Sequence, residues 1–467
     1  MILTYFVIRL GFFAITISPF APPDEVTHFG VSKVYSTVFL LPDNTPESYR
    51  YGLVTNIPWL YYWLMGKLLH LNFFGIPDLV FLRLLNIPLA VGTVLYARRT
   101  LLLITRDRLS EFLLLVVMTN MLMFSFLSAS VTYDNLTNLL AMMSVYHFSA
   151  FLAYRNGDDL VVSILCQMAG VLTKVTFLPL ALVLNLVLVL HEARKLRAFP
   201  AGLREWVLRS KRRAFFQTAL LILLLGLSLH LYGGNYLKYG SLAPGMAEVL
   251  TPAAAMEYRI AAREAIFRQY TEGKISYMQA LQMVPAIKHS GDISDTFYML
   301  MNYEKLKQDP SLWMTLPQYA AFWFQNITGM VFGIKGHLSM YKPTLWLIPV
   351  YSAMALAAVG FFLRGGFREE GRLPAVLTVI ALFYCGYLFY KVNYSAYTYY
   401  GVPGITLQGR YIFPVLGIIA VLFCRYLIAV FKGVRTRTAV AAATGVLFVW
   451  YDFPWFLMHV TADWFRG

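Results

Sequence analysis

Long apolar runs, separated by short polar loops, occupy most of the 467-residue chain. A run of about 20 apolar residues can cross the hydrocarbon core of a bilayer as a helix. The runs predict eleven spanning helices, at residues 2–20, 78–97, 109–127, 135–153, 159–173, 175–191, 215–233, 343–363, 373–391, 411–431 and 438–458. A shorter apolar run, from Pro58 to Leu71, is rich in Trp and Tyr and is typical of a helix at the membrane interface. The expected fold class is an all-α polytopic membrane protein.

Basic residues are concentrated in every second loop of this prediction. The clusters are Arg98, Arg99, Arg106 and Arg108; Arg155; the segment 194–213; Arg364, Arg368 and Arg372; and Lys432, Arg435 and Arg437. Loops rich in Lys and Arg stay on the cytoplasmic side of a membrane. With eleven spans all these clusters fall on one side, whereas a missed or extra span would scatter them. The pattern therefore predicts a cytoplasmic N-terminus and an external C-terminus.

Two long loops, 21–77 and 234–342, are external in this topology. They divide the chain into an N-terminal transmembrane module, 1–233, an external helical region, 234–342, and a C-terminal transmembrane module, 343–467. Within the external region, Asp309-Pro310 predicts the start of a helix, because acidic residues and proline favour a first helical turn.

Composition supports a membrane protein. The chain is 58% hydrophobic and 13% charged, with mean hydropathy +0.59, whereas soluble domains carry roughly 25% charged residues. The net charge of +15 follows from the basic loops, so we expect a lipid bilayer as partner and no nucleic acid. Three cysteines, Cys166, Cys385 and Cys424, lie inside apolar runs and have neither disulfide-framework nor zinc-site spacing. The first apolar run lacks a small-residue cleavage site, so we interpret it as a retained span.

The candidate chemistry begins directly after the first span, in the string Pro22-Pro23-Asp24-Glu25-Val26-Thr27-His28. Ionisable groups near a bilayer are costly and usually serve a function. The predicted topology brings further ionisable residues to the same external face: Arg83, Asp134, Lys174 and Arg410. Singly, each has an ordinary explanation, as a helix N-cap for an acid or as a snorkelling side chain for a base. Their shared placement indicates a site.

This set of residue types suits one reaction outside the cytoplasm. Nucleotide sugars are cytoplasmic, so external sugar transfer uses a sugar carried on a polyprenyl phosphate. A carboxylate accepts the proton of the acceptor hydroxyl, and Lys or Arg neutralises the phosphate leaving group. Arginine fits a phosphate with paired hydrogen bonds. The sequence therefore predicts a membrane glycosyltransferase.

Several motifs, in chain order, resemble the GT-C superfamily of polytopic glycosyltransferases, and more narrowly a bacterial family marked by Pro-Pro-Asp-Glu-x-x-His after span one. They are the Asp24 string, Asn56-Ile57-Pro58-Trp59-Leu60-Tyr61-Tyr62, Arg83-Leu84-Leu85-Asn86, the Lys174 turn with Pro179, Gly333 to Lys342, and Gln408-Gly409-Arg410-Tyr411 with Pro414. One departure is Trp59, where the superfamily segment has a proline. The resemblance implies a GT-C-like fold.

The resemblance also implies roles for the site residues. Asp24 corresponds to the general base of an inverting transfer, and Glu25 to a partner that tunes it or substitutes for it; which of the two acts stays open. His28 either orients the acid or is structural. Asp134 holds the acceptor or supports a cation. The remaining members are the phosphate-binding set Lys174, Arg410, Arg83, Gln408 and Tyr411, and the donor or acceptor pocket Tyr61, Tyr62, Lys335 and His337.

Cofactor, acceptor and location are also expectations. Some superfamily members use a divalent metal, and Asp24, Glu25, His28 and Asp134 could hold Mg²⁺ or Mn²⁺, but no metal ligand is assigned. The resemblance implies a multi-pass inner membrane protein of a bacterium, acting externally on a cell-surface glycan, lipid or protein. The alternatives are a lipid-linked glycan flippase or transporter, an O-antigen ligase or polymerase using diphosphate-linked glycans, and, less in keeping with a membrane site, a glycosidase.

Overall fold

The computed structural model describes residues 1–19, 21–192, 210–251, 254, 257–287, 290–336, 340–343, 346–366 and 368–465. Nearly all of the regular structure in these residues is helical. The described strands form one short antiparallel hairpin, in which β1 (Ile334–Lys335) pairs with β2 (Met340–Tyr341). The predicted all-α class is confirmed.

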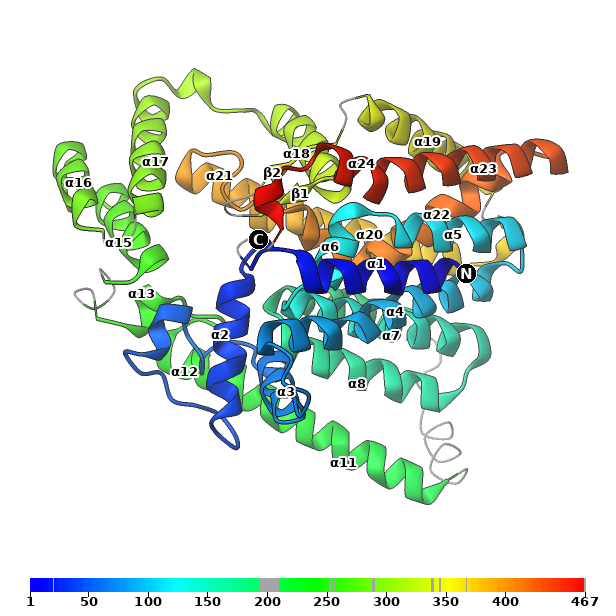
Figure 1. Cartoon of the computed structure of the whole chain (residues 1–467), viewed down its shortest axis with the longest axis horizontal. Helices are drawn as coiled ribbons and strands as arrows, with labels where there is room; N and C mark the ends of the chain where they lie inside the picture. Colours follow the sequence, from blue (N-terminus) through cyan, green and yellow to red (C-terminus); the bar gives the residue numbers. More distant parts are fainter. Residues whose placement is uncertain are drawn as a thin grey trace.

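A bundle of helices, many of which run in roughly the same direction, forms the body of the molecule (Figure 1). Its members are α1 (Ile2–Thr16), α4 (Asp78–Ile104), α5 (Arg108–Thr119), α6 (Leu122–Ser128), α7 (Tyr133–Tyr154), α8 (Gly157–Thr173), α9 (Leu178–Glu192), α11 (Lys211–Ser228), α19 (Leu347–Phe361), α20 (Leu373–Tyr387), α22 (Phe413–Ala429) and α23 (Val434–Tyr451). The most buried of the candidate spans contains α22, which packs against α4, α5, α7, α19 and α20.

Every predicted span corresponds to a helix in this bundle. Eight helical segments of the described chain are long and apolar enough to cross a membrane. A ninth consists of α5 and α6, which form a pair bent by 64°. The first and fifth predicted spans are the shorter helices α1, of 15 residues, and α8, of 17 residues. The chain is therefore a multi-pass helical membrane protein.

Ion pairs connect some of the loops that were predicted to share one side of the membrane. Arg437 at the start of α23 pairs with Asp107 in the α4–α5 loop, with a distance of 2.8 Å. Arg213 at the start of α11 pairs with Asp158 at the start of α8, with a distance of 2.6 Å. This agrees with the alternation of loops in the eleven-span prediction. The face of the membrane that each end occupies stays a prediction of the charge pattern.

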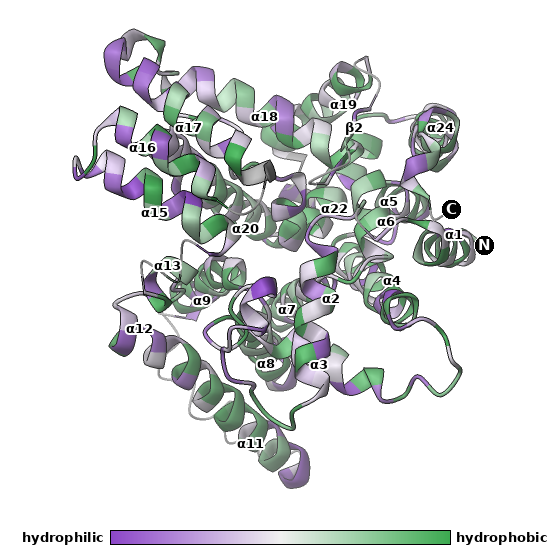
Figure 2. Cartoon of the chain, turned by 60° about the vertical axis from the view of Figure 1, so that its left-hand side comes forward, coloured by the Kyte–Doolittle hydropathy of each residue, from purple (hydrophilic) through white to green (hydrophobic). Residues whose placement is uncertain are grey.

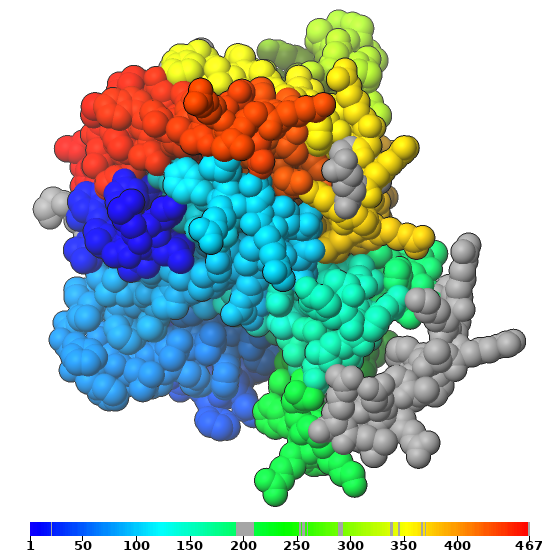
Figure 3. All heavy atoms as spheres, turned by 90° about the vertical axis from the view of Figure 1, so that its right-hand side faces the viewer, coloured from blue at the N-terminus to red at the C-terminus, as the bar shows by residue number. Residues whose placement is uncertain are grey.

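A charged residue in the first span is neutralised by the far end of the chain. Arg9 of α1 forms a buried ion pair with Asp452, which lies between α23 and α24 (Phe453–His459). Its guanidinium also donates to Asn120 Oδ1 at 3.0 Å and Ser125 Oγ at 2.7 Å, on either side of the break between α5 and α6. Figure 3 shows the N-terminal segment surrounded by these same parts of the chain. The Arg9 side chain thus links α1 to the break between α5 and α6 and to the junction between α23 and α24.

At the end of the bundle opposite the basic loops lie two helices, α2 (Glu25–Ser36) and α3 (Leu60–Leu69) (Figure 1). The apolar run predicted to be an interfacial helix forms α3. The two helices pack closely because Gly66 has no side chain: an added Cβ there would lie 2.8 Å from the carbonyl oxygen of Ser32. The α2–α3 pair is therefore a compact unit.

The described residues between 234 and 342 are largely helical, as predicted. They form α12 (Gly234–Tyr239), α13 (Met246–Val249), α15 (Arg259–Thr271), α16 (Tyr277–Met283), α17 (Ser290–Gln308) and α18 (Leu316–Phe332). Helices α15 to α17 enclose a small core of their own around Ile266, Phe267 and Leu300. Figure 2 shows many more polar residues on these helices than on α11.

The helix start predicted at Asp309-Pro310 is wrong. These residues open only a short 3-10 turn, Pro310–Leu312, in which the Asp309 side chain accepts a hydrogen bond from the Ser311 N–H. The long helix, α18, begins at Leu316, where Thr315 and Gln318 form a capping box. A capping box satisfies two free N–H groups at once, which favours the later start.

Candidate functional site

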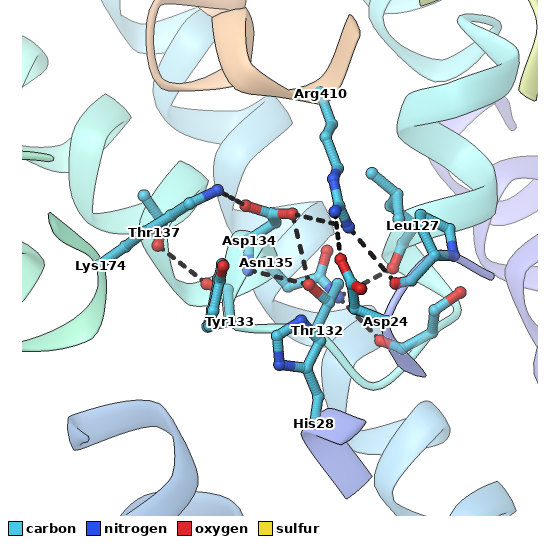
Figure 4. A network of polar contacts seen from close by, with 12 residues as sticks. Asp24, His28, Leu127, Thr132, Tyr133, Asp134, Asn135, Thr137, Lys174 and Arg410 are labelled. Atoms are coloured by element: carbon cyan, nitrogen blue, oxygen red, sulfur yellow. Dashed lines mark hydrogen bonds and ion pairs between the residues drawn. The ribbon is translucent and has the colours of Figure 1, made fainter. Parts of the chain in front are cut away.

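Five of the predicted site residues converge at the end of the bundle opposite the basic loops (Figure 4). Asp24 and His28 belong to the start of α2, and Asp134 to the first turn of α7. Lys174 lies between α8 and α9, and Arg410 lies in η10 (Gly409–Ile412), directly before α22. Each of these residues is placed where a helix begins or ends. We call these five residues the polar cluster.

Asp24 adopts an unusual backbone conformation. Its φ of 60° and ψ of 5° lie in the left-handed region, which among the described non-glycine residues is shared with Arg155 alone. This conformation costs an L-residue roughly 1–2 kcal/mol, although Asp tolerates it better than most. The Asp24 side chain does not cap α2. Its carboxylate instead forms an ion pair with Arg410.

Arg410 joins the two carboxylates of the polar cluster. Besides its ion pair with Asp24, its Nη1 lies 3.7 Å from Asp134 Oδ2 and donates to the Pro23 carbonyl oxygen at 3.3 Å. Its Nε is buried with no hydrogen-bond partner among the described residues. The preceding Gly409 permits this placement, because a Cβ there would lie 2.7 Å from the backbone of Met330 in α18. The Gly-Arg pair thus has a packing explanation.

Asp134 is not a helix cap, because Thr132 takes that position and accepts a hydrogen bond from the Asp134 N–H. The Asp134 carboxylate forms an ion pair with Lys174. The Lys174 ammonium also lies over the rings of Tyr133, at 4.7 Å, and Tyr411, at 5.1 Å. Contacts of this kind stabilise a cation that is withdrawn from water. Thr132 and Tyr133 were missed by the sequence analysis; a Thr preceding a helix is a signal for the first of them.

The members of the polar cluster differ in their access to solvent. The side chains of Asp134 and Arg410 are each 3% exposed, and that of Lys174 is 7% exposed. The Asp24 side chain is 34% exposed. Asp24 is therefore the charged group that an incoming ligand reaches first.

His28 is held in this cluster by Tyr62 of α3, whose hydroxyl oxygen lies 2.8 Å from His28 Nδ1. The ring edge faces Tyr133, with 4.4 Å between centroids. Burial lowers the pKa of His28 to about 4, and the nearby cations act in the same direction, while Asp24 and Asp134 oppose it. His28 is therefore neutral at ordinary pH.

Glu25 and Arg83 lie outside the polar cluster, although both were predicted to belong to the site. They form a fully buried ion pair, with Arg83 Nε 2.8 Å from Glu25 Oε1. Arg83 also donates to the carbonyl oxygen of Ile17 at 2.7 Å, and the Val131 N–H donates to Glu25 at 2.9 Å. The pair joins the end of α1, the start of α2 and the turn before α7. It holds the peptide segments that carry Asp24 and Asp134.

Tyr61 and Lys335, two of the remaining predicted residues, make hydrogen bonds to residues outside the polar cluster. The Tyr61 hydroxyl donates to Asn86 at 3.1 Å, and Lys335 donates to the carbonyl oxygen of Leu407 at 3.0 Å. Gln408 has a buried side-chain oxygen without a hydrogen-bond partner among the described residues. His337 lies outside the described residues. Gln408 precedes Arg410 by two residues, and its side-chain oxygen can accept a further hydrogen bond.

Within the described part of the chain, no three His, Cys, Asp or Glu side chains come together as a metal site. The divalent ion considered from the sequence stays a prediction, and we assign no step to it.

The three cysteines are free thiols, with Cys166 and Cys424 buried.

Comparison with known proteins leaves the site as the principal guide to function. No family model and no curated protein sequence matches the chain. Among solved structures, the archaeal oligosaccharyltransferase AglB from Archaeoglobus fulgidus, in complex with an inhibitory peptide and a dolichol-phosphate, is similar with a TM-score of 0.49 and 10% sequence identity. The likeness covers 100% of this chain and 56% of AglB, so the chain spans little more than half of that protein's length. A likeness at this level carries no argument about activity.

Proposed function

We propose that this protein is a membrane glycosyltransferase that moves a sugar from a polyprenyl-phosphate donor to an acceptor hydroxyl. The observation that carries the proposal is the pairing of an accessible carboxylate, Asp24, with a buried guanidinium, Arg410, at the end of a transmembrane bundle. A carboxylate can accept a proton, and a guanidinium can bind a phosphate. Their position at helix ends suits a substrate with a lipid tail and a polar head.

The balance of charge in the polar cluster supports a donor with a single negative charge. Asp24 and Asp134 offset Lys174 and Arg410, while His28 is neutral. Lys174 is already neutralised by Asp134 within a buried pair. Arg410 is therefore the cation that a ligand can take over once Asp24 moves away. A sugar phosphodiester brings one negative charge, whereas a diphosphate brings at least two, and an uncompensated buried charge is expensive. This favours the polyprenyl monophosphate over the diphosphate donor of an O-antigen ligase.

The same geometry suggests an order of events. The donor phosphate takes the place of the Asp24 carboxylate beside Arg410, which separates Asp24 from Arg410. Asp24 then accepts the proton of the acceptor hydroxyl as its oxygen bonds to the anomeric carbon from the face opposite the phosphate. The bond between that carbon and the phosphate oxygen breaks, and polyprenyl phosphate leaves with the electron pair. In this order of events, Arg410 and Lys174 offset the negative charge that grows on the phosphate.

A flippase is the main alternative, and the position of the cluster favours an enzyme. Transporter sites lie near the bilayer midplane between discontinuous helices. Here the cluster lies where helices begin and end, next to α2 and α3. We place the protein in the inner membrane of a bacterium, with the cluster external, and propose a cell-surface glycan, lipid or protein as acceptor.

Replacing Asp24 by Asn tests the proposal. Asp24→Asn keeps the shape and the tolerance for a left-handed backbone but removes the base, so we expect release of polyprenyl phosphate to fall by roughly 10²–10⁴-fold. Donor binding should not weaken, because the phosphate no longer competes with a carboxylate for Arg410, and thermal stability should change little. The control is Asp43→Asn, which alters an exposed carboxylate in the same external loop. Wild-type turnover by the Asp24 variant would exclude it as the base.

A further inference from the structure

The imidazole of His28 has one nitrogen in use and one unused. Nδ1 lies 2.8 Å from the Tyr62 hydroxyl oxygen. Nε2 is buried and has no hydrogen-bond partner among the described residues. Leaving a buried polar atom without a partner costs about 1–3 kcal/mol. Native structures retain such atoms where strain, catalysis or an additional ligand accounts for them.

The contact with Tyr62 determines which nitrogen carries the proton. The Tyr62 hydroxyl makes no other hydrogen bond among the described residues. Its hydrogen is satisfied only if it points at His28 Nδ1, which makes Nδ1 the acceptor and places the imidazole proton on Nε2. Close packing of α2 on α3 at Gly66 holds the two rings in this relation. The unused atom is therefore an N–H donor.

This donor faces the polar cluster. Figure 4 shows the His28 ring pointing into the cluster beneath Thr132 and Tyr133, beside Asp24. The ionisable groups around it are Asp24 on α2, Tyr62 on α3, Tyr133 and Asp134 on α7, Lys174 after α8, and Arg410 before α22. A ligand oxygen that displaces Asp24 from Arg410 enters next to this N–H.

We propose that His28 is a donor-binding residue that gives a hydrogen bond from Nε2 to an oxygen of the sugar-phosphate head group, as a neutral imidazole. The inference rests on the proposed function and adds a residue that recognises the donor. The oxygen belongs either to the phosphate or to a sugar hydroxyl, and both are acceptors for a neutral N–H. Burial keeps the ring neutral down to about pH 4, so His28 binds the donor without moving a proton.

Two amide variants separate the nitrogens. The amide nitrogen of Gln reaches the position of Nε2, whereas that of Asn stays near Nδ1. We expect His28→Gln to bind donor within a few-fold of wild type, and His28→Asn to bind it about tenfold more weakly, the effect of one lost hydrogen bond. Tyr62→Phe, which removes the hydroxyl that sets the tautomer, should weaken binding by an intermediate amount.

The titrations use the full-length protein in detergent, with a polyprenyl phosphate and its glucosyl phosphodiester as separate probes. Equal weakening of both by His28→Asn assigns the contact to the phosphate. Weakening of the phosphodiester alone assigns it to the sugar. Between pH 5 and 8 the pH–rate profiles of wild type and His28→Gln should be parallel, because a group with a pKa of about 4 does not titrate there.

Other outcomes overturn the inference. If wild type binds the probes and His28→Asn binds them equally well, His28 does not touch the donor, although the proposed function stands. If the acid limb of the profile disappears in His28→Gln, His28 transfers a proton and is not a neutral donor. If both amide variants lose thermal stability but retain donor affinity per folded molecule, the role is structural. If wild type binds neither probe, the proposed function fails first.

Discussion

Removing the guanidinium of Arg410 should slow sugar transfer more than it weakens donor binding. Arg410 contacts Asp24, Asp134 and the Pro23 carbonyl oxygen, and it is the cation that we assign to the phosphate. Loss of one charge-stabilising group aimed at a transition state costs roughly 10²–10³-fold in rate, or about 2.7–4 kcal/mol. The phosphate gains negative charge as the glycosidic bond breaks, so the bound donor loses less than the transition state. Asp134 stays paired with Lys174 in Arg410→Ala, so the fold should survive.

Arg410→Lys should recover only part of the loss. The two terminal nitrogens of Arg410 reach oxygens on three different residues. A lysine keeps the positive charge but offers one nitrogen, which cannot bridge the same set. We expect its single-turnover rate to lie between those of wild type and Arg410→Ala. The matched control is Arg435→Ala, an exposed arginine at the opposite end of the bundle.

The assay is single-turnover release of polyprenyl phosphate at saturating donor, with a donor titration on the same preparations. The reasoning is refuted if Arg410→Ala turns over at the wild-type rate. It is also refuted if Arg410→Ala binds the donor much more weakly but, at saturating donor, loses no more rate than the Arg435→Ala control. Arg410 would then contribute to binding of the donor in the ground state alone.

Two further predictions concern the frame of the site and its orientation. Arg83→Leu leaves the buried Glu25 carboxylate without the positive charge of Arg83, which should cost about 3–5 kcal/mol and lower the melting temperature in detergent. Glu25→Gln combined with Arg83→Leu should restore much of this loss. A single variant that melts like wild type contradicts the structural role of this pair. In a background lacking Cys166, Cys385 and Cys424, a cysteine in place of Lys274 should react with a membrane-impermeant thiol reagent added outside cells. A cysteine in place of Arg435 should not react. The reverse pattern would invert the topology.

The helices and the grouping of the site residues were accessible from the sequence. Each predicted apolar run corresponds to a helix of the structure, because length and composition mark candidate membrane-spanning helices. The alternation of basic loops placed Asp24, Asp134, Lys174 and Arg410 at one end, and the structure brings them into contact. The sequence could not reveal the break at Asn120, because it interrupts an apolar run without Pro or Gly.

The different fates of Asp24 and Glu25 were also beyond the sequence. Asp24 precedes α2 with a left-handed backbone, whereas Glu25 is the first residue of the helix, so these two adjacent acids face different surroundings. Glu25 faces Arg83 in the interior, and Asp24 faces Arg410 at the accessible edge. Which neighbour each acid meets depends on how α2 lies across α1 and α4, and the string Pro-Pro-Asp-Glu contains no information on that angle.

The ion pair between Arg9 and Asp452 has a consequence for the biosynthesis of the protein. A membrane protein is inserted from its N-terminus, so α1 enters the bilayer long before Asp452 has been translated. During that interval the Arg9 charge has no carboxylate partner, a condition that costs roughly 2.5–3.5 kcal/mol at the centre of a helix in the membrane. The first helix is therefore less stable in the bilayer until α23 has been inserted. Completion of the bundle is coupled to the arrival of its last spanning helix, and a ribosome that stalls before residue 452 leaves behind a chain whose intramembrane arginine has hydrogen-bond partners but no carboxylate to neutralise it.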